Sequence, residues 1–205
     1  MSQQNLIRLA VALTTATWIV VVLVRGSKLD ISLLSSFGVV TAVVTIAVAL
    51  LDRLLWRLPW VSTIFKQHSP AIRGTWKAHV VSSRQEEPFL GYLVVEQTLT
   101  TVSARMLMET GWSETLAGHW SRSDDGHPAV FYIWRRFPAN EVDDAEGPGY
   151  IQYGAGVLEV RGGPPFRVRG PYWTSERHGG TVTLSHHRKT ICKSYDQAAN
   201  LYEGS

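Results

Sequence analysis

The chain has a single cysteine, Cys192, among its 205 residues. A lone cysteine excludes a disulfide framework and a cysteine-based zinc site, and it is typical of a domain in a reducing compartment. The formal net charge is only +3, which is too small to indicate a protein that binds DNA or RNA.

Sequence motifs for catalysis are also absent. The chain has no Gly-x-Ser-x-Gly nucleophile elbow and no glycine-rich phosphate loop that opens a helix. His186 and His187 are adjacent, so on a strand their side chains would point to opposite faces, and no carboxylate lies at the spacing of a metal ligand. We therefore expect no enzyme, no metal ion and no cofactor.

Two apolar stretches, Leu9–Val24 and Ile31–Leu51, open the chain. The second carries no charged residue and, at about 1.5 Å per residue, is long enough to cross a hydrocarbon core of about 30 Å. The first could be a cleaved signal peptide, but it lacks a small-x-small cleavage site. We predict a two-helix transmembrane hairpin, with helices over about 6–24 and 31–51.

The charged residues around these stretches suggest an orientation. Arg25 and Lys28 lie between them, whereas Arg8, Arg53, Arg57 and Lys66 flank them. This excess in the flanks predicts that both ends of the hairpin face the cytoplasm. Trp56, Arg57 and Trp60 in 54–65, with Arg53 just before them, predict an interfacial extension, which completes a first domain over 1–66. Small residues recur in both helices and would permit self-association, although alanine is common in such helices.

The remaining residues, 67–205, have the alternating pattern of β-strands, separated by Gly, Pro, Asn and Asp at turn positions. We predict eight strands joined mostly by short turns, so that neighbours pair antiparallel in an up-and-down barrel of lipocalin-like shape. A β-sandwich is the alternative, and 193–201 could form a closing helix. The predicted strands are 71–81, 89–99, 101–109, 112–121, 129–137, 149–160, 166–176 and 180–188.

The faces of the predicted strands indicate what the barrel contains. In the first strand the inward set would be Ile72, Gly74, Trp76, Ala78 and Val80, and the solvent-facing set Arg73, Thr75, Lys77 and His79. Later strands place polar and aromatic residues on both faces; for example, Tyr132, Trp134 and Arg136 share one face. This mixture predicts a cavity with polar anchors rather than a barrel filled by aliphatic side chains.

Three segments behind the apolar front carry a family resemblance. They are Ile72-Arg73-Gly74-Thr75-Trp76, Glu96-Gln97-Thr98, and Gly170-Pro171-Tyr172-Trp173-Thr174 followed by Arg177 and Gly180. In order and spacing the chain resembles the two-transmembrane β-barrel effectors of bacterial CBASS anti-phage immunity. The resemblance implies an inner-membrane protein whose cytoplasmic barrel binds a cyclic dinucleotide made by a partner nucleotidyltransferase. The protein would then form a homo-oligomer and disrupt the lipid bilayer, which kills the infected cell.

The ligand-binding residues that we predict are Tyr172, Trp173, Thr174, Arg177, Gln97, Thr98 and Trp76. Tyr172 and Trp173 would stack on bases, although both could instead be core residues. Arg177 or Arg169 would contact phosphate, and Thr174, Gln97 and Thr98 would contact polar base edges. Arg177 would face the other side of its strand unless a bulge or turn intervenes. Trp76 has a favoured alternative as a plug near the closed end of the barrel.

Two other functions fit the same sequence. Gly74-x-Trp76 on a first strand is also a lipocalin-like motif, which would suit a membrane-tethered binding protein for an apolar ligand. The barrel could also serve only for assembly of a structural membrane protein.

Overall fold

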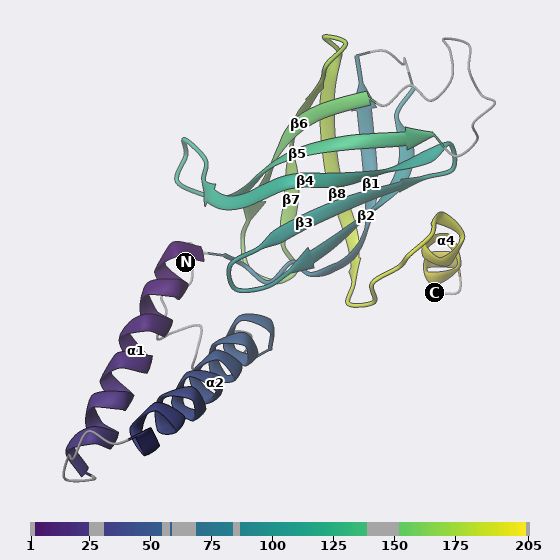
Figure 1. Cartoon of the computed structure of the whole chain (residues 1–205). Helices are drawn as coiled ribbons and strands as arrows, with labels where there is room; N and C mark the ends of the chain where they lie inside the picture. Colours follow the sequence, from purple (N-terminus) through teal and green to yellow (C-terminus); the bar gives the residue numbers. More distant parts are fainter. Residues whose placement is uncertain are drawn as a thin grey trace. The chain divides into compact units, whose positions relative to one another are not determined.

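The computed structural model describes residues 3–24, 31–54, 58, 69–83, 87–138 and 152–203. The chain forms two compact units, one of residues 1–67 with 98–100 and one of 68–97 with 101–205. The first unit contains two helices, and the second contains the strands and a short C-terminal helix (Figure 1).

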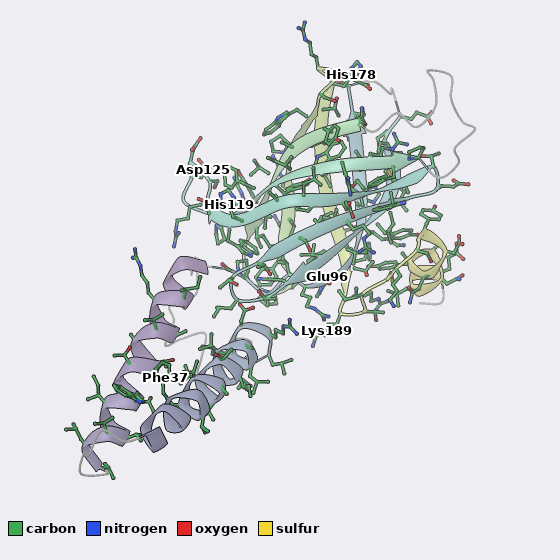
Figure 2. All side chains as sticks on the ribbon, in the orientation of Figure 1. Phe37, Glu96, His119, Asp125, His178 and Lys189 are labelled. Carbon is green, nitrogen blue, oxygen red and sulfur yellow. The ribbon has the colours of Figure 1, made fainter. Side chains whose placement is uncertain are left out.

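The first unit is a pair of apolar helices, α1 (Gln3–Val24) and α2 (Ile31–Arg53). Trp18 of α1 contacts Phe37 of α2 (labelled in Figure 2) edge to face, with ring centroids 5.9 Å apart. Away from this contact, large apolar side chains are exposed, among them Val20 and Leu23 of α1 and Val43 of α2. Two helices therefore form where the apolar stretches predicted them.

Among the residues that the structure describes, no helix combines the length and the apolar character needed to cross a membrane. The structure thus does not support the expected transmembrane hairpin. The expected interfacial extension over 54–65 lies outside the described residues except for Leu54 and Leu58.

The second unit is a closed antiparallel barrel of eight strands in sequential order, as predicted (Figure 1). A closed barrel has no free sheet edge, and it excludes the alternative β-sandwich. The strands are β1 (Gly74–Ser82), β2 (Phe89–Gln97), β3 (Val102–Met108), β4 (Gly111–Arg122), β5 (Pro128–Pro138), β6 (Gln152–Arg161), β7 (Arg167–Thr174) and β8 (Gly179–Arg188).

Alternate side chains of these strands fill one half of the barrel. Trp76, Val95, Val130 and Leu158 are at most 2% exposed and belong to one core cluster. The Trp76 indole N–H donates a hydrogen bond to the Ile72 carbonyl over 2.9 Å, so the polar atom of this buried ring is satisfied. The inward set predicted for β1 is confirmed.

A bulge at Leu116 shifts the alternation within β4. The register moves between Thr115 and Ala117, so inward positions are odd before the bulge and even after it. Ser113 therefore faces the interior at one end of β4, and Trp120 packs against the core at the other. A strict period of two could not have predicted both residues on the same face.

Helix α4 (Tyr195–Glu203) covers the outside of β2 and β3. Its Tyr202 ring stacks on Tyr92, with centroids 5.5 Å apart, in a second cluster that includes Cys192. Thr75, expected to face solvent, is instead fully buried, and its hydroxyl donates to the Thr190 carbonyl and accepts from the Cys192 N–H. The expectation was wrong because the segment leading to α4 folds over this part of β1.

Tyr202→Phe is expected to destabilise the barrel by about 1–3 kcal/mol, because the Tyr202 hydroxyl is the donor shared by the Thr75 and His186 carbonyls, each 2.7 Å away. Burial, with a smaller contribution from Cys192, raises the pKa of Tyr202 to about 12. The unfolded phenol ionises near 10, so this group's stabilisation is complete below pH 10 and declines between pH 10 and 12.

Chemical denaturation followed by tryptophan fluorescence measures both effects. Tyr195→Phe is the matched control, because this tyrosine lies on the same helix, its ring contacts Tyr92, and its hydroxyl makes no hydrogen bond to another described residue. An equal loss of stability in both variants would contradict the assigned role of the Tyr202 hydroxyl. An unchanged alkaline decline in Tyr202→Phe would contradict the pH effect.

Candidate ligand-binding cavity

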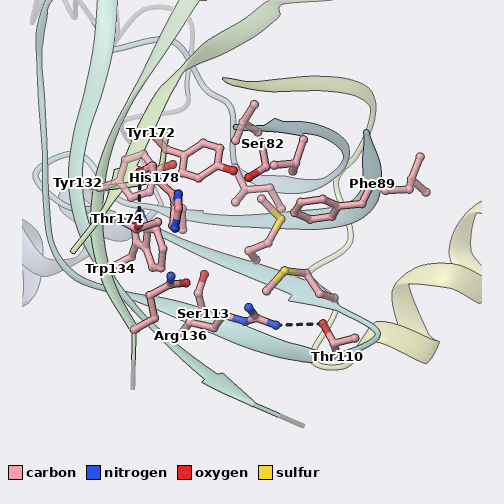
Figure 3. Close-up of a pocket in the computed structure, with 18 of the residues that line it drawn as sticks. Ser82, Phe89, Thr110, Ser113, Tyr132, Trp134, Arg136, Tyr172, Thr174 and His178 are labelled. Atoms are coloured by element: carbon pink, nitrogen blue, oxygen red, sulfur yellow. Dashed lines mark hydrogen bonds between the residues drawn. The ribbon is translucent and has the colours of Figure 1, made fainter. Parts of the chain in front are cut away.

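One end of the barrel encloses a cavity of about 320 Å³. It lies where β1, β3, β5 and β7 end and where the next strand of each pair begins (Figure 3). Its walls combine apolar side chains, such as Leu93 and Met106, with aromatic and polar ones. The cavity that the mixed strand faces predicted is therefore present, while the other end of the barrel is filled by the core around Trp76.

A row of alternating glycines and tyrosines crosses five strands along the wall of this cavity. The register pairs Gly118 with Tyr132, Tyr132 with Gly156, Gly156 with Tyr172, and Tyr172 with Gly180. A Cβ atom on Gly156 would lie 2.7 Å from the Tyr132 hydroxyl, and one on Gly180 would lie 2.7 Å from Cε1 of Tyr172. Each tyrosine thus lies across a glycine of the next strand, which leaves space in the lumen.

Trp134 extends this arrangement by one row toward the mouth. Its register partner is Gly154, where a Cβ atom would collide with the six-membered ring of the indole. Thr174 pairs with the same glycine from the other side. Figure 3 shows Tyr132, Trp134, Tyr172 and Thr174 grouped on one wall. The cavity therefore has a largely aromatic wall whose rings need glycines beside them.

Toward the mouth, beyond Trp134 on β5, the cavity lining becomes polar. Arg136, at the end of β5, donates a hydrogen bond over 3.1 Å to the hydroxyl of Thr110 in the β3–β4 turn, and Ser113 lies beside them (Figure 3). Glu109 and His178 also line the cavity. Arg136 is the one arginine or lysine among the described lining residues, so this part of the site offers a single guanidinium to an anion.

The hydroxyl of Tyr132 is a polar group within the aromatic wall. Tyr132 is 9% exposed and lines the cavity. Burial, with a smaller contribution from Tyr172, raises the pKa of Tyr132 far above its ordinary value, so the phenol stays protonated. Among the described residues, no hydrogen bond involves this hydroxyl. Its hydrogen-bonding partner is therefore water or a ligand in the cavity.

Two of the seven predicted ligand-binding residues, Tyr172 and Thr174, line the cavity. Trp173 follows Tyr172 on β7, so its side chain is on the outer face and is 50% exposed. Arg177 is exposed and lies in the turn after β7, where its φ is +63° and its N–H donates to the Thr174 carbonyl. A turn thus intervenes before Arg177, which does not line the cavity.

The other three predicted residues also lie away from the cavity. Gln97 is buried, and its side chain joins the Ile72 N–H and the Pro70 carbonyl, which holds the segment entering β1. Thr98 follows directly at the end of β2, and Trp76 belongs to the core. Arg169, the alternative phosphate contact, is exposed on β7.

A pattern in the sequence does mark the cavity residues that were not assigned to the site. Tyr132, Trp134 and Arg136 alternate on β5, and Gly154 and Gly156 have the same spacing on β6. A pair of glycines with a period of two, in a strand beside alternating aromatics, indicates rings that lie across the neighbouring strand. Arg136 continues the same face toward the mouth.

No group of three or more His, Cys, Asp or Glu residues that could hold a metal ion occurs within the described ranges. The comparisons with protein-family models and with curated proteins found no match to this chain. The chemistry of the cavity must therefore carry the functional argument.

Proposed function

We propose that the barrel is a receptor for a small ligand that combines a planar ring with an anionic group, and that this ligand is a cyclic dinucleotide. The observation that carries the proposal is the cavity in which Tyr132, Trp134 and Tyr172 face the same space as Arg136. Aromatic rings stack on any nucleobase, and a guanidinium forms charge-assisted hydrogen bonds with phosphate. The volume of about 320 Å³ is within the range of small-molecule sites.

The proposed role of α1 and α2 is to act on a membrane. Two observations support this role: the stretch 31–51 carries no charge, and apolar side chains of the helix pair are exposed, for example Leu23, which is 73% exposed, and Val39, which is 64% exposed. In water such surfaces are costly, whereas a bilayer solvates them. Ligand binding to a cytoplasmic barrel would then promote self-association and disruption of the inner membrane, as the resemblance to CBASS effectors suggests. In this proposal the protein is a non-enzymatic antiviral effector.

A second candidate is a binding protein for an apolar ligand. Phe89, Leu93, Met106 and Val182 also line the cavity, and methionine side chains adapt to ligands of varied shape. A fatty acid could place its chain against these residues and its carboxylate near Arg136. The two candidates differ in whether the ligand must contain a planar ring.

A thermal-shift titration of the full chain in detergent micelles separates them. The ligands are cyclic di-AMP, cyclic di-GMP, cyclic GMP–AMP, cyclic di-UMP and a long-chain fatty acid. A ligand at a hundred times its Kd should stabilise the folded barrel by about 2.7 kcal/mol. A shift with a cyclic dinucleotide supports the proposed receptor. A shift with the fatty acid alone would refute it in favour of the second candidate.

A further inference from the structure

Tyr132 occupies the inner end of the cavity. On its β5 face the next inward residue on one side is Val130, which is buried in the core, and on the other side it is Trp134, which lines the cavity. Arg136 is the second inward residue after Tyr132 in the direction of the mouth. It is about 13 Å from Tyr132 along the strand, at ~3.3 Å per residue. The side chains of β5 therefore run from core, through a phenol and an indole, to a guanidinium.

The hydroxyl of Tyr132 lies against the neighbouring strand rather than across the lumen. A Cβ atom on Gly156 would be 2.7 Å from the hydroxyl oxygen and 2.8 Å from the ring carbon that bears it. The same glycine pairs with Tyr172 on its other side, so the two tyrosines flank one strip of backbone. This packing fixes the position of the hydroxyl at the cavity floor.

A hydroxyl at this position has a cost if nothing pairs with it. The Tyr132 hydroxyl is not among the fully buried polar atoms that lack a partner, so water in the cavity can reach it. A ligand that displaces this water must replace its hydrogen bond, since a donor buried without a partner is unfavourable by about 1–3 kcal/mol. No hydrogen bond joins the Tyr132 hydroxyl to another described residue. A polar atom at the inner end of an aromatic cavity suits a ligand whose ring has hydrogen-bonding groups on the edge that enters deepest.

We infer that Tyr132 is a specificity-determining residue, whose hydroxyl hydrogen-bonds to the polar edge of the ligand's ring at the cavity floor. The ring then enters first, between the aromatic wall and the apolar side of the cavity, and the anionic group stays near Arg136. The identity of the ring as a nucleobase rests on the proposed function. The direction of entry rests on the order of Tyr132, Trp134 and Arg136 along β5.

Tyr132→Phe in the full chain tests this inference by two measurements. The melting temperature without ligand should be unchanged or slightly higher, since the hydroxyl bonds to no described residue of the protein. The affinity for the tightest-binding of the four cyclic dinucleotides should fall about tenfold, because a base-edge group loses its partner. Tyr153→Phe is the matched control, as Tyr153 is 47% exposed on the outer face of β6, and both measurements should stay at wild-type values.

The possible outcomes separate the inference from the proposed function. If the wild type binds none of the four cyclic dinucleotides, the proposed function is refuted. The hydrogen bond proposed between Tyr132 and a nucleobase edge is then refuted with it. If the wild type binds one of them and Tyr132→Phe binds it equally well, the inference is overturned and the proposed function stands. A lower melting temperature in Tyr132→Phe would overturn the inference as well, since it would assign the hydroxyl a structural role.

Discussion

Arg136→Gln should weaken binding of the cyclic dinucleotide by roughly ten- to a hundredfold. Arg136 supplies the guanidinium of the described cavity lining, and a hydrogen bond to a charged group contributes about 1.5–3 kcal/mol. Glutamine keeps hydrogen-bonding capacity but removes the charge, so the remaining affinity should also depend less on salt concentration. Isothermal titration calorimetry at two ionic strengths measures both effects.

The control for charge is Arg169→Gln. Arg169 lies on the outer face of β7 and is exposed, so its substitution changes the net charge by the same amount without touching the cavity. Arg135 is a poorer control, because its side chain pairs with Glu114. Equal losses in Arg136→Gln and Arg169→Gln would mean that the overall charge, and not the cavity, attracts the ligand.

Gly156→Ala should reduce ligand binding by at least about tenfold while the barrel remains folded. The added Cβ atom would lie within 3 Å of the Tyr132 hydroxyl and two of its ring carbons, so the ring must move away from β6 into the lumen. Overpacking of this kind typically costs about 1–3 kcal/mol of stability, and the displaced ring occupies the space in which the ligand would stack. The binding titration and a melting curve measure the two effects.

Gly163→Ala provides the comparison, since a Cβ atom there meets nothing within 4 Å. It should leave both binding and melting temperature near wild-type values. Retention of full affinity in Gly156→Ala would show that the ligand does not use the space in front of Tyr132. The position of the ligand along the aromatic wall would then have to be assigned closer to Trp134 and Arg136.

The barrel was largely predictable from local pattern. All eight strands and the C-terminal helix lie within a few residues of the predicted ranges, because period-two alternation and turn residues are local features of the chain. The exceptions are particular. The bulge at Leu116 depends on how β4 pairs with β5, and the burial of Thr75 depends on the segment before α4, where Thr190 is 115 residues away in sequence.

The cavity residues were predicted less well. Tyr172 and Thr174 were expected to bind a ligand and line the cavity, whereas Gln97 and Thr98 were assigned from an isolated motif and lie elsewhere. A short polar motif does not reveal whether its side chains already bond to the backbone. Gln97 does so with Ile72 and Pro70, which leaves its amide occupied.

By itself, the sequence determined the apolar stretches at the front, the number and order of the strands, and which residues share a face in regular stretches of strand such as β1, since these depend on spacing along the chain. Tertiary structure decided which residues of different strands meet. The register places Gly156 between Tyr132 and Tyr172, with Gly118 and Gly180 at the two ends of the row, and this row creates the space that a ligand could fill. The physical reason is that register depends on closure of the whole barrel, in which each strand is fixed by two neighbours at once.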